Sequence, residues 1–254
     1  MSLDRCLASL DEAIAAAASL GLDTTAAMIV RETARTRLGF PSLAYVLALA
    51  GGTGVGKSTL LNAIAGEVVS AASARRPTTG EPVAWVPAAR ARELAALLGW
   101  LGVKHVREHG GGRLDDLAVI DLPDFDSVAA EHRERVDALL PRVDAIAWVV
   151  DPEKYKDDLM HGHYLHEFAP RLRRQIVVLN RSDLLGADDV RRVSEDLRAQ
   201  LRRDGAGDIE IVATHARDGA AGITELRRWL ESSIEAKRVI ASRLGAEEIG
   251  RAHV

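Results

Sequence analysis

The sequence predicts an α/β fold, a doubly wound and mostly parallel sheet with helices on both faces, preceded by an N-terminal helical hairpin. Three observations lead to this prediction. Short apolar runs alternate with stretches of helical periodicity along most of the chain, as in a parallel sheet. A glycine-rich segment at 51–56 joins one such run to a helical stretch. The 254 residues, 47% of them hydrophobic, are enough for one sizeable core with an appendage.

The N-terminal segment, residues 1–42, is expected to form the helical hairpin. Its first helix, residues 3–20, carries an apolar stripe at helical spacing: Leu3, Leu7, Leu10 and Ile14. Gly21 breaks this helix, and a second helix is expected over about 24–38. Two roles stay open: the hairpin packs against the sheet or the terminal helix, or it joins a bundle with C-terminal helices or another subunit. Residues 43–240 are expected to form the main domain, with a tail at 241–254.

A phosphate-binding loop follows the first predicted strand, residues 45–50. Residues 51–58 meet every position of G-x-x-x-x-G-K-[ST], and a helix is expected over 57–65. In such a loop backbone N–H groups converge on phosphate oxygens, a lysine reaches the terminal phosphates and a hydroxyl is placed on Mg²⁺. The sequence therefore predicts a P-loop NTPase fold with a nucleoside triphosphate site. The predicted phosphate-binding residues are Gly52, Thr53, Gly54, Val55, Gly56, Lys57, Ser58 and Thr59.

Residues for a Mg²⁺ ion come from three places. Ser58 belongs to the phosphate loop, and Asp121 ends an apolar strand at 117–121, where it can hold Mg²⁺ through water. Residues 77–82, before the strand at 83–86, resemble the switch I segment of P-loop GTPases, and this resemblance implies that Thr79 supplies the second hydroxyl. Thr78 is the alternative, because adjacent threonines cannot be told apart from the sequence. Lys57 and Thr79 are the predicted catalytic residues.

A base-binding loop is predicted after the strand at 176–179, where residues 180–183 fit N-[KR]-x-D. Asp183 can accept two hydrogen bonds from the N1–H and 2-amino groups of guanine, a donor pair that adenine lacks. The stem of Arg181 can lie along the base, although a guanidinium is not equivalent to the usual lysine. After a further strand, 209–213, the backbone N–H of Ala216 is expected to approach the guanine carbonyl. The predicted base-binding residues are Asn180, Arg181, Asp183, His215 and Ala216.

The ordered set of these motifs resembles the G domain of translation-factor-class (TRAFAC) P-loop GTPases over residues 44–230. The spacing of three residues from Thr79 to Pro82, before the strand at 83–86, is similar to that in bacterial dynamin-like and ribosome-binding GTPases. The resemblance implies hydrolysis of GTP to GDP and phosphate with Mg²⁺, in a molecular switch. Two alternatives stay open: a dynamin-like GTPase that associates with membranes or with itself, and a nucleotide-binding module that does not hydrolyse. Expected partners are GTP and a second copy or an activating protein, with a ribosome or a membrane surface as further alternatives.

Two residues depart from the family pattern. Asp124 stands where many G domains have a glycine whose N–H contacts the γ-phosphate, so this contact requires more backbone strain. Phe125 stands where many have a glutamine that orients the attacking water, and phenylalanine cannot hydrogen-bond water. We therefore expect slow intrinsic turnover.

Groups that could assist hydrolysis are few. Arg75 and Arg76, before the switch threonines, are either a cis arginine finger or solvated side chains. Some relatives hold an activating monovalent cation with a side-chain oxygen in the phosphate loop, and Gly54 at the matching position has no such oxygen.

Other segments are assigned no function from the sequence. An insertion contains a short helix at 88–98 and a turn at 110–112, and residues 151–158 are expected to form a surface loop. His161, His163 and His166 fit a solvated helix face better than a metal site, because only the last two share neighbouring positions on a helix. Residues 188–203 are expected to form an exposed, ion-paired helix.

Composition narrows the class of protein further. The single cysteine, Cys6, excludes a disulfide framework and suits a reducing cytoplasm, and the net charge of −4 gives no general attraction to nucleic acid. No apolar run reaches the roughly 18–20 residues that span a bilayer. We expect a cytoplasmic protein without a transmembrane segment, with peripheral membrane association as an alternative. Residues 248–254 back-translate to a sequence like a library adapter, so the natural chain is expected to continue beyond about Glu247.

Overall fold

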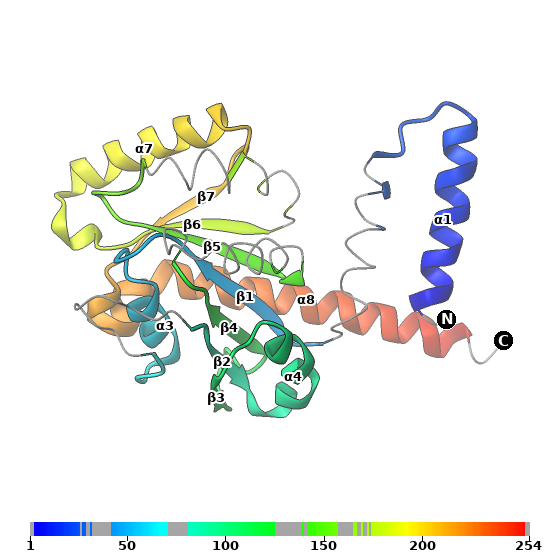
Figure 1. Ribbon diagram of the computed structural model, residues 1–254, viewed down its shortest axis with the longest axis horizontal. Coiled ribbons are helices and arrows are strands. Elements are labelled where there is room, and N and C mark those ends of the chain that lie inside the picture. The colour runs from blue at the N-terminus through cyan, green and yellow to red at the C-terminus, as the bar shows by residue number, and fades with distance from the viewer. Residues whose placement is uncertain are drawn as a thin grey trace.

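A single mixed sheet of seven strands lies at the centre of the part of the chain that the structure describes (Figure 1). The computed structural model describes residues 3–25, 27–28, 31, 42–70, 81–124, 139, 142–156, 165–166, 169, 172 and 174–251. The strands are β1 (Tyr45–Ala50), β2 (Val83–Pro87), β3 (His105–His109), β4 (Leu117–Asp121), β5 (Ala145–Val150), β6 (Gln175–Leu179) and β7 (Glu210–Ala213). Their spatial order is β3-β2-β4-β1-β5-β6-β7.

Five of these strands run in the same direction. β1 pairs in parallel with β4 and with β5, and β5, β6 and β7 continue the parallel arrangement. β2 is antiparallel to β4, and β3 is parallel to β2, so these two strands form an edge of opposite direction. The carboxyl ends of β1, β4, β5, β6 and β7 therefore share one edge of the sheet.

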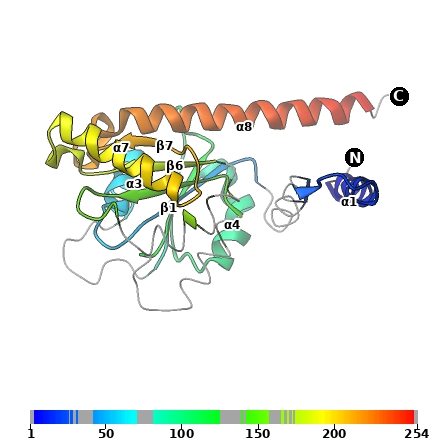
Figure 2. The ribbon, with the colours of Figure 1, turned by 90° about the horizontal axis from the view of Figure 1, so that it is seen from above.

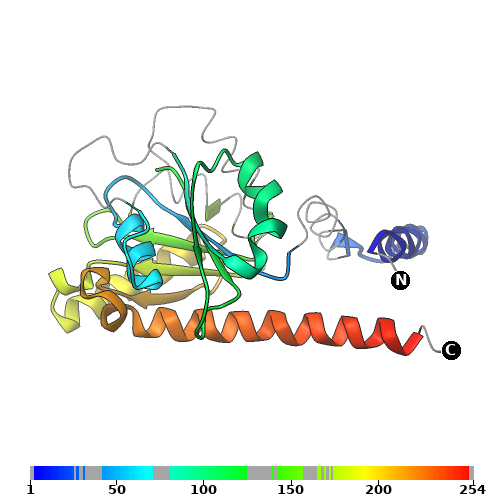
Figure 3. The ribbon, with the colours of Figure 1, turned by 90° about the horizontal axis from the view of Figure 1, so that it is seen from below.

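Helices cover both faces of the sheet. Those that contribute to its two cores are α3 (Lys57–Ala65), α4 (Ala91–Trp100), α7 (Ala187–Arg203) and α8 (Thr224–Arg251). The described residues also form α1 (Leu3–Ser19) and the short 3-10 segments η1 (Ala88–Arg90), η5 (Ser182–Leu184) and η6 (Ala216–Ile223). Figure 3 shows α8 on one side of the sheet and α4 on the other. The predicted doubly wound α/β fold is confirmed.

Alternation along the buried strands produces a separate core on each face. In β1 every residue is buried, and successive side chains point to opposite faces. Val46, Ala48 and Ala50 join the core under α4 and α7, which those helices complete with Leu94, Leu97, Leu98, Leu197 and Leu201. Tyr45, Leu47 and Leu49 join the core under α3 and α8, together with Leu60, Leu61, Ile64, Leu226, Trp229, Leu230 and Ile234. Both cores hold β1 in place, and β1 in turn positions the loop that follows it.

The segment between β2 and β4 differs from the prediction in one element. The expected helix at 88–98 is present as η1 and α4, and the glycines at 110–112 follow β3. β3 itself was not predicted, because His105–His109 contains one apolar residue and its residues are largely exposed at the sheet edge. An edge strand of this composition gains stability from pairing with β2 and leaves little pattern in the sequence.

The first helix of the expected hairpin is present as α1, with Ile14 buried. Most of the second, expected over 24–38, lies outside the described residues, so the hairpin stays a prediction. Asp11 of α1 forms an ion pair with Arg31 at 3.4 Å. In Figures 1 and 2, α1 stands apart from the sheet, and the C-terminal half of α8 extends past the sheet.

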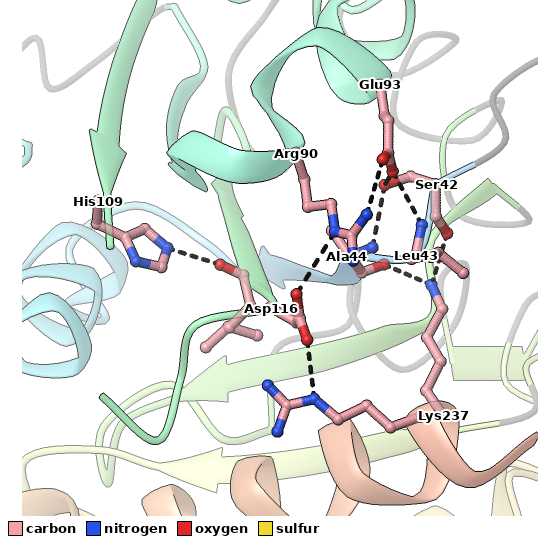
Figure 4. Close-up of polar contacts among 10 residues, drawn as sticks. Ser42, Leu43, Ala44, Arg90, Glu93, His109, Asp116 and Lys237 are labelled. Atoms are coloured by element: carbon pink, nitrogen blue, oxygen red, sulfur yellow. Dashed lines mark hydrogen bonds and ion pairs between the residues drawn. The ribbon is translucent and has the colours of Figure 1, made fainter. Parts of the chain in front are cut away.

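A polar network fastens the segment before β1 to α4 and α8, as Figure 4 shows. Lys237 Nζ on α8 donates to the carbonyl oxygens of Ser42 (3.1 Å) and Ala44, and to Asp144 Oδ2 (2.9 Å). Glu93 on α4 accepts from the Ser42 hydroxyl and the Leu43 N–H, each at 3.1 Å. These contacts lie at the amino end of β1 and fix the entry of the chain into the sheet.

Among the helices that the structure describes, none combines the length and the apolar character needed to cross a bilayer.

Candidate nucleotide site

Five loops meet at the edge of the sheet where the parallel strands end. They follow β1 (51–56), β4 (122–124), β5 (151–156), β6 (180–183) and β7 (214–215). In open α/β sheets ligands bind outside the carboxyl ends of the strands. The phosphate, metal and base motifs predicted from sequence each follow one of these strands, so the fold brings them together.

The phosphate loop has a backbone that only glycine adopts easily at its last turn. Gly56 has φ 95° and ψ 28°, and a Cβ added there would collide with the Asn180 side chain. Gly51 lies so close to the carbonyl oxygen of Val149 in β5 that a Cβ would not fit. Since α3 begins at Lys57 without a side-chain cap, its first N–H groups face the loop and favour an anion there.

Lys57 is buried, with 5% of its side chain exposed, and its ammonium lies inside the loop. Nζ donates to the carbonyl oxygens of Gly51 at 2.9 Å and Gly52 at 3.3 Å. It also donates to Asp124 Oδ1 from the segment after β4. The positive charge of the loop is therefore concentrated at its centre and is paired with a carboxylate.

Ser58 and Asp121 form a pair suited to a hard cation. The Ser58 hydroxyl donates to Asp121 Oδ2 at 2.7 Å, and Asp121 Oδ1 is buried without a hydrogen-bond partner in the described part of the chain. Burial raises the pKa of Asp121 to about 6, although the nearby Lys57 ammonium opposes that shift. An unpaired buried carboxylate oxygen beside a hydroxyl is a donor set that Mg²⁺ prefers, so these residues fit the predicted ion.

Asn180 ties the base-binding loop to the phosphate loop. Its Nδ2 donates to the Val55 carbonyl oxygen at 3.0 Å, and its Oδ1 accepts from Thr214 Oγ1 at 3.1 Å and from the Ala216 N–H at 3.3 Å. The side chain thus joins the loops after β1, β6 and β7. The Ala216 N–H, which is predicted to contact a guanine carbonyl oxygen, here donates to Asn180 Oδ1.

Asp183 and His215 lie near the same loops with exposed side chains. Asp183 is in η5, and 40% of the His215 side chain is exposed, 3.6 Å from Asp218. The Ser182 N–H and hydroxyl both donate to the Thr214 carbonyl oxygen, at 2.9 and 3.0 Å. These bonds hold the loop after β6 against the loop after β7 and leave the Asp183 carboxylate accessible.

The structure adds Asp151 and Lys154 to the site, which the sequence analysis had placed in a surface loop. Asp151 is 2% exposed, and its Oδ2 accepts from Arg181 Nη1 at 3.1 Å. Its Oδ1 accepts from the N–H groups of Glu153 and Lys154, and Lys154 Nζ donates to the Thr53 carbonyl oxygen at 2.7 Å. Arg181 itself has φ 58°, rare for a residue with a side chain. Asp151 comes directly after the fully apolar strand β5, and this position in the sequence could have identified it as a site residue, as it did for Asp121 at the end of β4.

Several predicted residues lie outside the described part of the chain. They are Arg75, Arg76, Thr78, Thr79, Phe125, His161 and His163. In the described part, no group of three or more histidine, cysteine, aspartate or glutamate side chains could hold a metal ion by itself. The predicted exposed helix at 188–203 is present in α7, with ion pairs between Arg191 and Asp188 and between Arg192 and Asp189.

One curated relative is similar over most of this chain. It is the tRNA modification GTPase MnmE of Halorhodospira halophila, 29% identical over 189 residues, which are 74% of this chain and 34% of the relative. The chain thus spans about a third of the length of that protein.

Solved structures of G domains share the fold. One is a chain of an oligomerised bacterial dynamin pair, described as sensing and tethering membranes. The match covers 96% of this chain and 46% of the dynamin chain, at 16% identity and a TM-score of 0.59. The match to Era of Aquifex aeolicus bound to GDP and AlF4⁻ covers 74% of this chain and 56% of Era, at 21% identity and a TM-score of 0.52. The match to a bacterial selenocysteine-specific elongation factor covers 76% of this chain and 29% of that factor, at 19% identity and a TM-score of 0.53.

The family comparison covers the strands and loops that build the site. The model of the family described as 50S ribosome-binding GTPase matches residues 46–181, just over half of the chain, from β1 through the first residues of the base-binding loop. With the phosphate loop, the Ser58–Asp121 pair and the 180–183 loop at one sheet edge, the chain belongs to this family of TRAFAC P-loop GTPases.

Proposed function

We propose that this chain binds GTP with Mg²⁺, hydrolyses it slowly to GDP and phosphate, and acts as a molecular switch. One observation carries the proposal: the phosphate loop, the Ser58–Asp121 pair and the base-binding loop lie together at the carboxyl edge of the sheet. Asn180 joins two of these parts directly through its 3.0 Å hydrogen bond to Val55. A nucleotide that contacts all three would extend along this edge.

Each part has a distinct role in the proposal. The backbone N–H groups of 52–59 bind the phosphates, and Lys57 neutralises their charge. Ser58, Asp121 and Thr79 would hold Mg²⁺, which when bound neutralises charge that develops on the transferring phosphoryl group. Lys57 and Thr79 are the proposed catalytic residues.

Base selectivity is assigned to the loops after β6 and β7. The exposed Asp183 carboxylate accepts from guanine, Arg181 lies along the base, and Asn180, His215 and Ala216 complete the loops around it. Asp151 holds the Arg181 guanidinium at 3.1 Å, which restricts where the arginine stem can lie.

Slow turnover follows from the residue after Asp124. Phe125 cannot hydrogen-bond an attacking water, so the water must be oriented by backbone groups or by a partner. Arg75 or Arg76, in the segment before Thr78, is the internal candidate for charge stabilisation. A second copy of the chain or an activating protein is the external one.

Product formation tests this proposal. The purified chain with GTP and Mg²⁺ is expected to yield GDP and phosphate, with ATP giving far less product and EDTA stopping the reaction. Ser58→Ala should lower turnover by at least about tenfold, because it removes a Mg²⁺ ligand and the partner of Asp121. Ser242→Ala, which removes a hydroxyl bonded only within α8, is the matched control. GTP turnover that is unaffected by EDTA and by Ser58→Ala would contradict the proposal.

A dynamin-like GTPase is the second candidate, and the shape of α8 favours it. This helix has 28 residues and runs past the sheet, as Figure 1 shows, so it offers a surface outside the G domain. The likeness to a bacterial dynamin extends over 96% of the chain. Turnover per molecule that rises with protein concentration, or sedimentation with liposomes, would support this candidate. Concentration-independent turnover without lipid binding would exclude it.

Two further alternatives have direct tests. Tight GTP binding without product would identify a nucleotide-binding module that does not hydrolyse. Co-sedimentation with ribosomal subunits that depends on GTP would identify a ribosome partner, in line with the family description. We keep a hairpin at 1–42, a G domain at 43–240 and a tail at 241–254 as the proposed organisation, in a cytoplasmic or peripheral membrane protein.

A further inference from the structure

The Lys57–Asp124 pair occupies the centre of the phosphate site. A lysine ammonium has three donor hydrogens, and Lys57 has three acceptors: the carbonyl oxygens of Gly51 and Gly52 and Asp124 Oδ1. The two charged side chains are largely shielded, with 5% of Lys57 and 12% of Asp124 exposed. Salt and water therefore screen this pair much less than a surface pair.

A phosphate oxygen that binds Lys57 must replace one of these three acceptors. The carbonyl oxygens belong to the loop backbone, and the backbone of Gly51 lies against the Val149 carbonyl, which leaves no room for the loop to move toward β5. Asp124 reaches the ammonium through its side chain, and a side chain can change rotamer while its backbone stays in place. Asp124 is therefore the acceptor that a phosphate displaces most easily.

We propose that the Asp124 carboxylate competes with the terminal phosphate of GTP for the Lys57 ammonium and thereby disfavours GTP relative to GDP. The inference rests on the proposed function, because it concerns the same site. The third phosphate of GTP brings a further negative charge to the ammonium that Asp124 now neutralises. GDP ends one phosphate earlier and requires less displacement of the carboxylate. Asp124 is thus a specificity-determining residue between the two guanine nucleotides.

Asp124→Asn tests this inference, since it keeps the size of the side chain and removes its charge. Calorimetric titration with GDP and with a non-hydrolysable GTP analogue, both with Mg²⁺, gives two affinities for each protein. We expect the ratio of GTP to GDP affinity to rise by about tenfold in the variant, equivalent to about 1.4 kcal/mol. Asp208→Asn, an exposed carboxylate paired with Arg202 before β7, is the matched control and should leave the ratio unchanged.

The stability of the nucleotide-free protein gives a second readout. Asp124→Asn removes the only carboxylate that contacts Lys57 in the described part of the chain, so the melting temperature should fall by about 4 °C. The GTP analogue should raise it more in the variant than in the wild type. If Asp124→Asn does not fold, Asp124→Gly removes the same charge and introduces the residue that many G domains carry.

The outcomes separate the inference from the function on which it rests. An unchanged affinity ratio, in proteins that bind both nucleotides, would overturn the inference alone, whatever the melting temperature. Failure of the wild type to bind either guanine nucleotide would overturn the proposed function and the inference with it.

Discussion

The contact between Asp151 and Arg181 leads to a prediction about how long a guanine nucleotide stays bound. Asp151→Asn keeps an oxygen for the N–H groups of Glu153 and Lys154, at 3.1 and 2.9 Å, and removes the negative charge that faces Arg181 Nη1 at 3.1 Å. The guanidinium is then free to leave the position in which the proposed site needs it.

The size of the effect follows from the exposure of the two side chains. A hydrogen bond to a charged group contributes about 1.5–3 kcal/mol. Asp151 is 2% exposed, but Arg181 is 35% exposed, so water compensates for part of the loss. We expect a loss of about 1 kcal/mol in nucleotide binding, or about fivefold in affinity, with most of it in the dissociation rate.

Stopped-flow release of a fluorescent GDP measures this rate. Asp196→Asn is the control. Asp196 on α7 accepts hydrogen bonds from Tyr155 and Lys156, both at 2.8 Å, in the same 151–156 loop that contains Asp151. No contact between Asp196 and Arg181 is present in the described part of the chain. Release that is about fivefold faster in Asp151→Asn and unchanged in Asp196→Asn is the expected result. Equal release from the wild type and a well-folded Asp151→Asn would refute the reasoning.

Two further predictions concern stability. Gly56→Ala should lower the melting temperature more than Gly207→Ala. Both glycines have positive φ, but only at Gly56 would the new Cβ collide with a neighbour, the Asn180 side chain. Equal decreases of the melting temperature in the two variants would contradict this. Burial lowers the pKa of His109, which stacks on Trp85 with ring centroids 3.5 Å apart, so the unfolded chain binds more protons at that residue. Its contribution to stability is complete above the unfolded pKa and is lost as the pH falls below it. As the pH falls from about 7.5 to about 5.5, the free energy of unfolding measured in urea should decrease less for His109→Phe than for the wild type. Equal decreases in the two proteins would argue against this role of His109.

Much of the fold could be predicted because its signals are local. β1, the phosphate loop and α3 follow one another without interruption, so apolar periodicity and the spacing of Gly51, Gly56 and Lys57 define them together. Asp121 ends β4, whose other residues are all apolar, and Asn180 comes directly after the apolar residues 176–179 of β6. Parallel strands bring such ends to one edge of the sheet. The order of the motifs along the chain was therefore enough to predict that Ser58 lies near Asp121 and that Asn180 lies near the phosphate loop.

The contacts that could not be predicted depend on strand register and on side-chain direction. Asp151 lies beside Arg181 because β5 and β6 pair in a register that places Val150 opposite Leu179. Asp124 reaches Lys57 across 67 positions in sequence, and Lys237 reaches Ala44 across 193. β3 is stabilised by its pairing with β2, and its own residues carry no alternation of apolar and polar side chains.

The base preference of Asp183 tests the central claim most directly. Calorimetric titration of the wild type with GTP, ATP and XTP, and of Asp183→Asn with the same three nucleotides, is the measurement. The account predicts that the wild type prefers GTP over ATP and that Asp183→Asn loses this preference and gains affinity for XTP, because xanthine offers a carbonyl oxygen where guanine offers its amino group. ATP binding equal to or tighter than GTP binding in the wild type would contradict the account, since residues 180–183 would then be an ordinary turn.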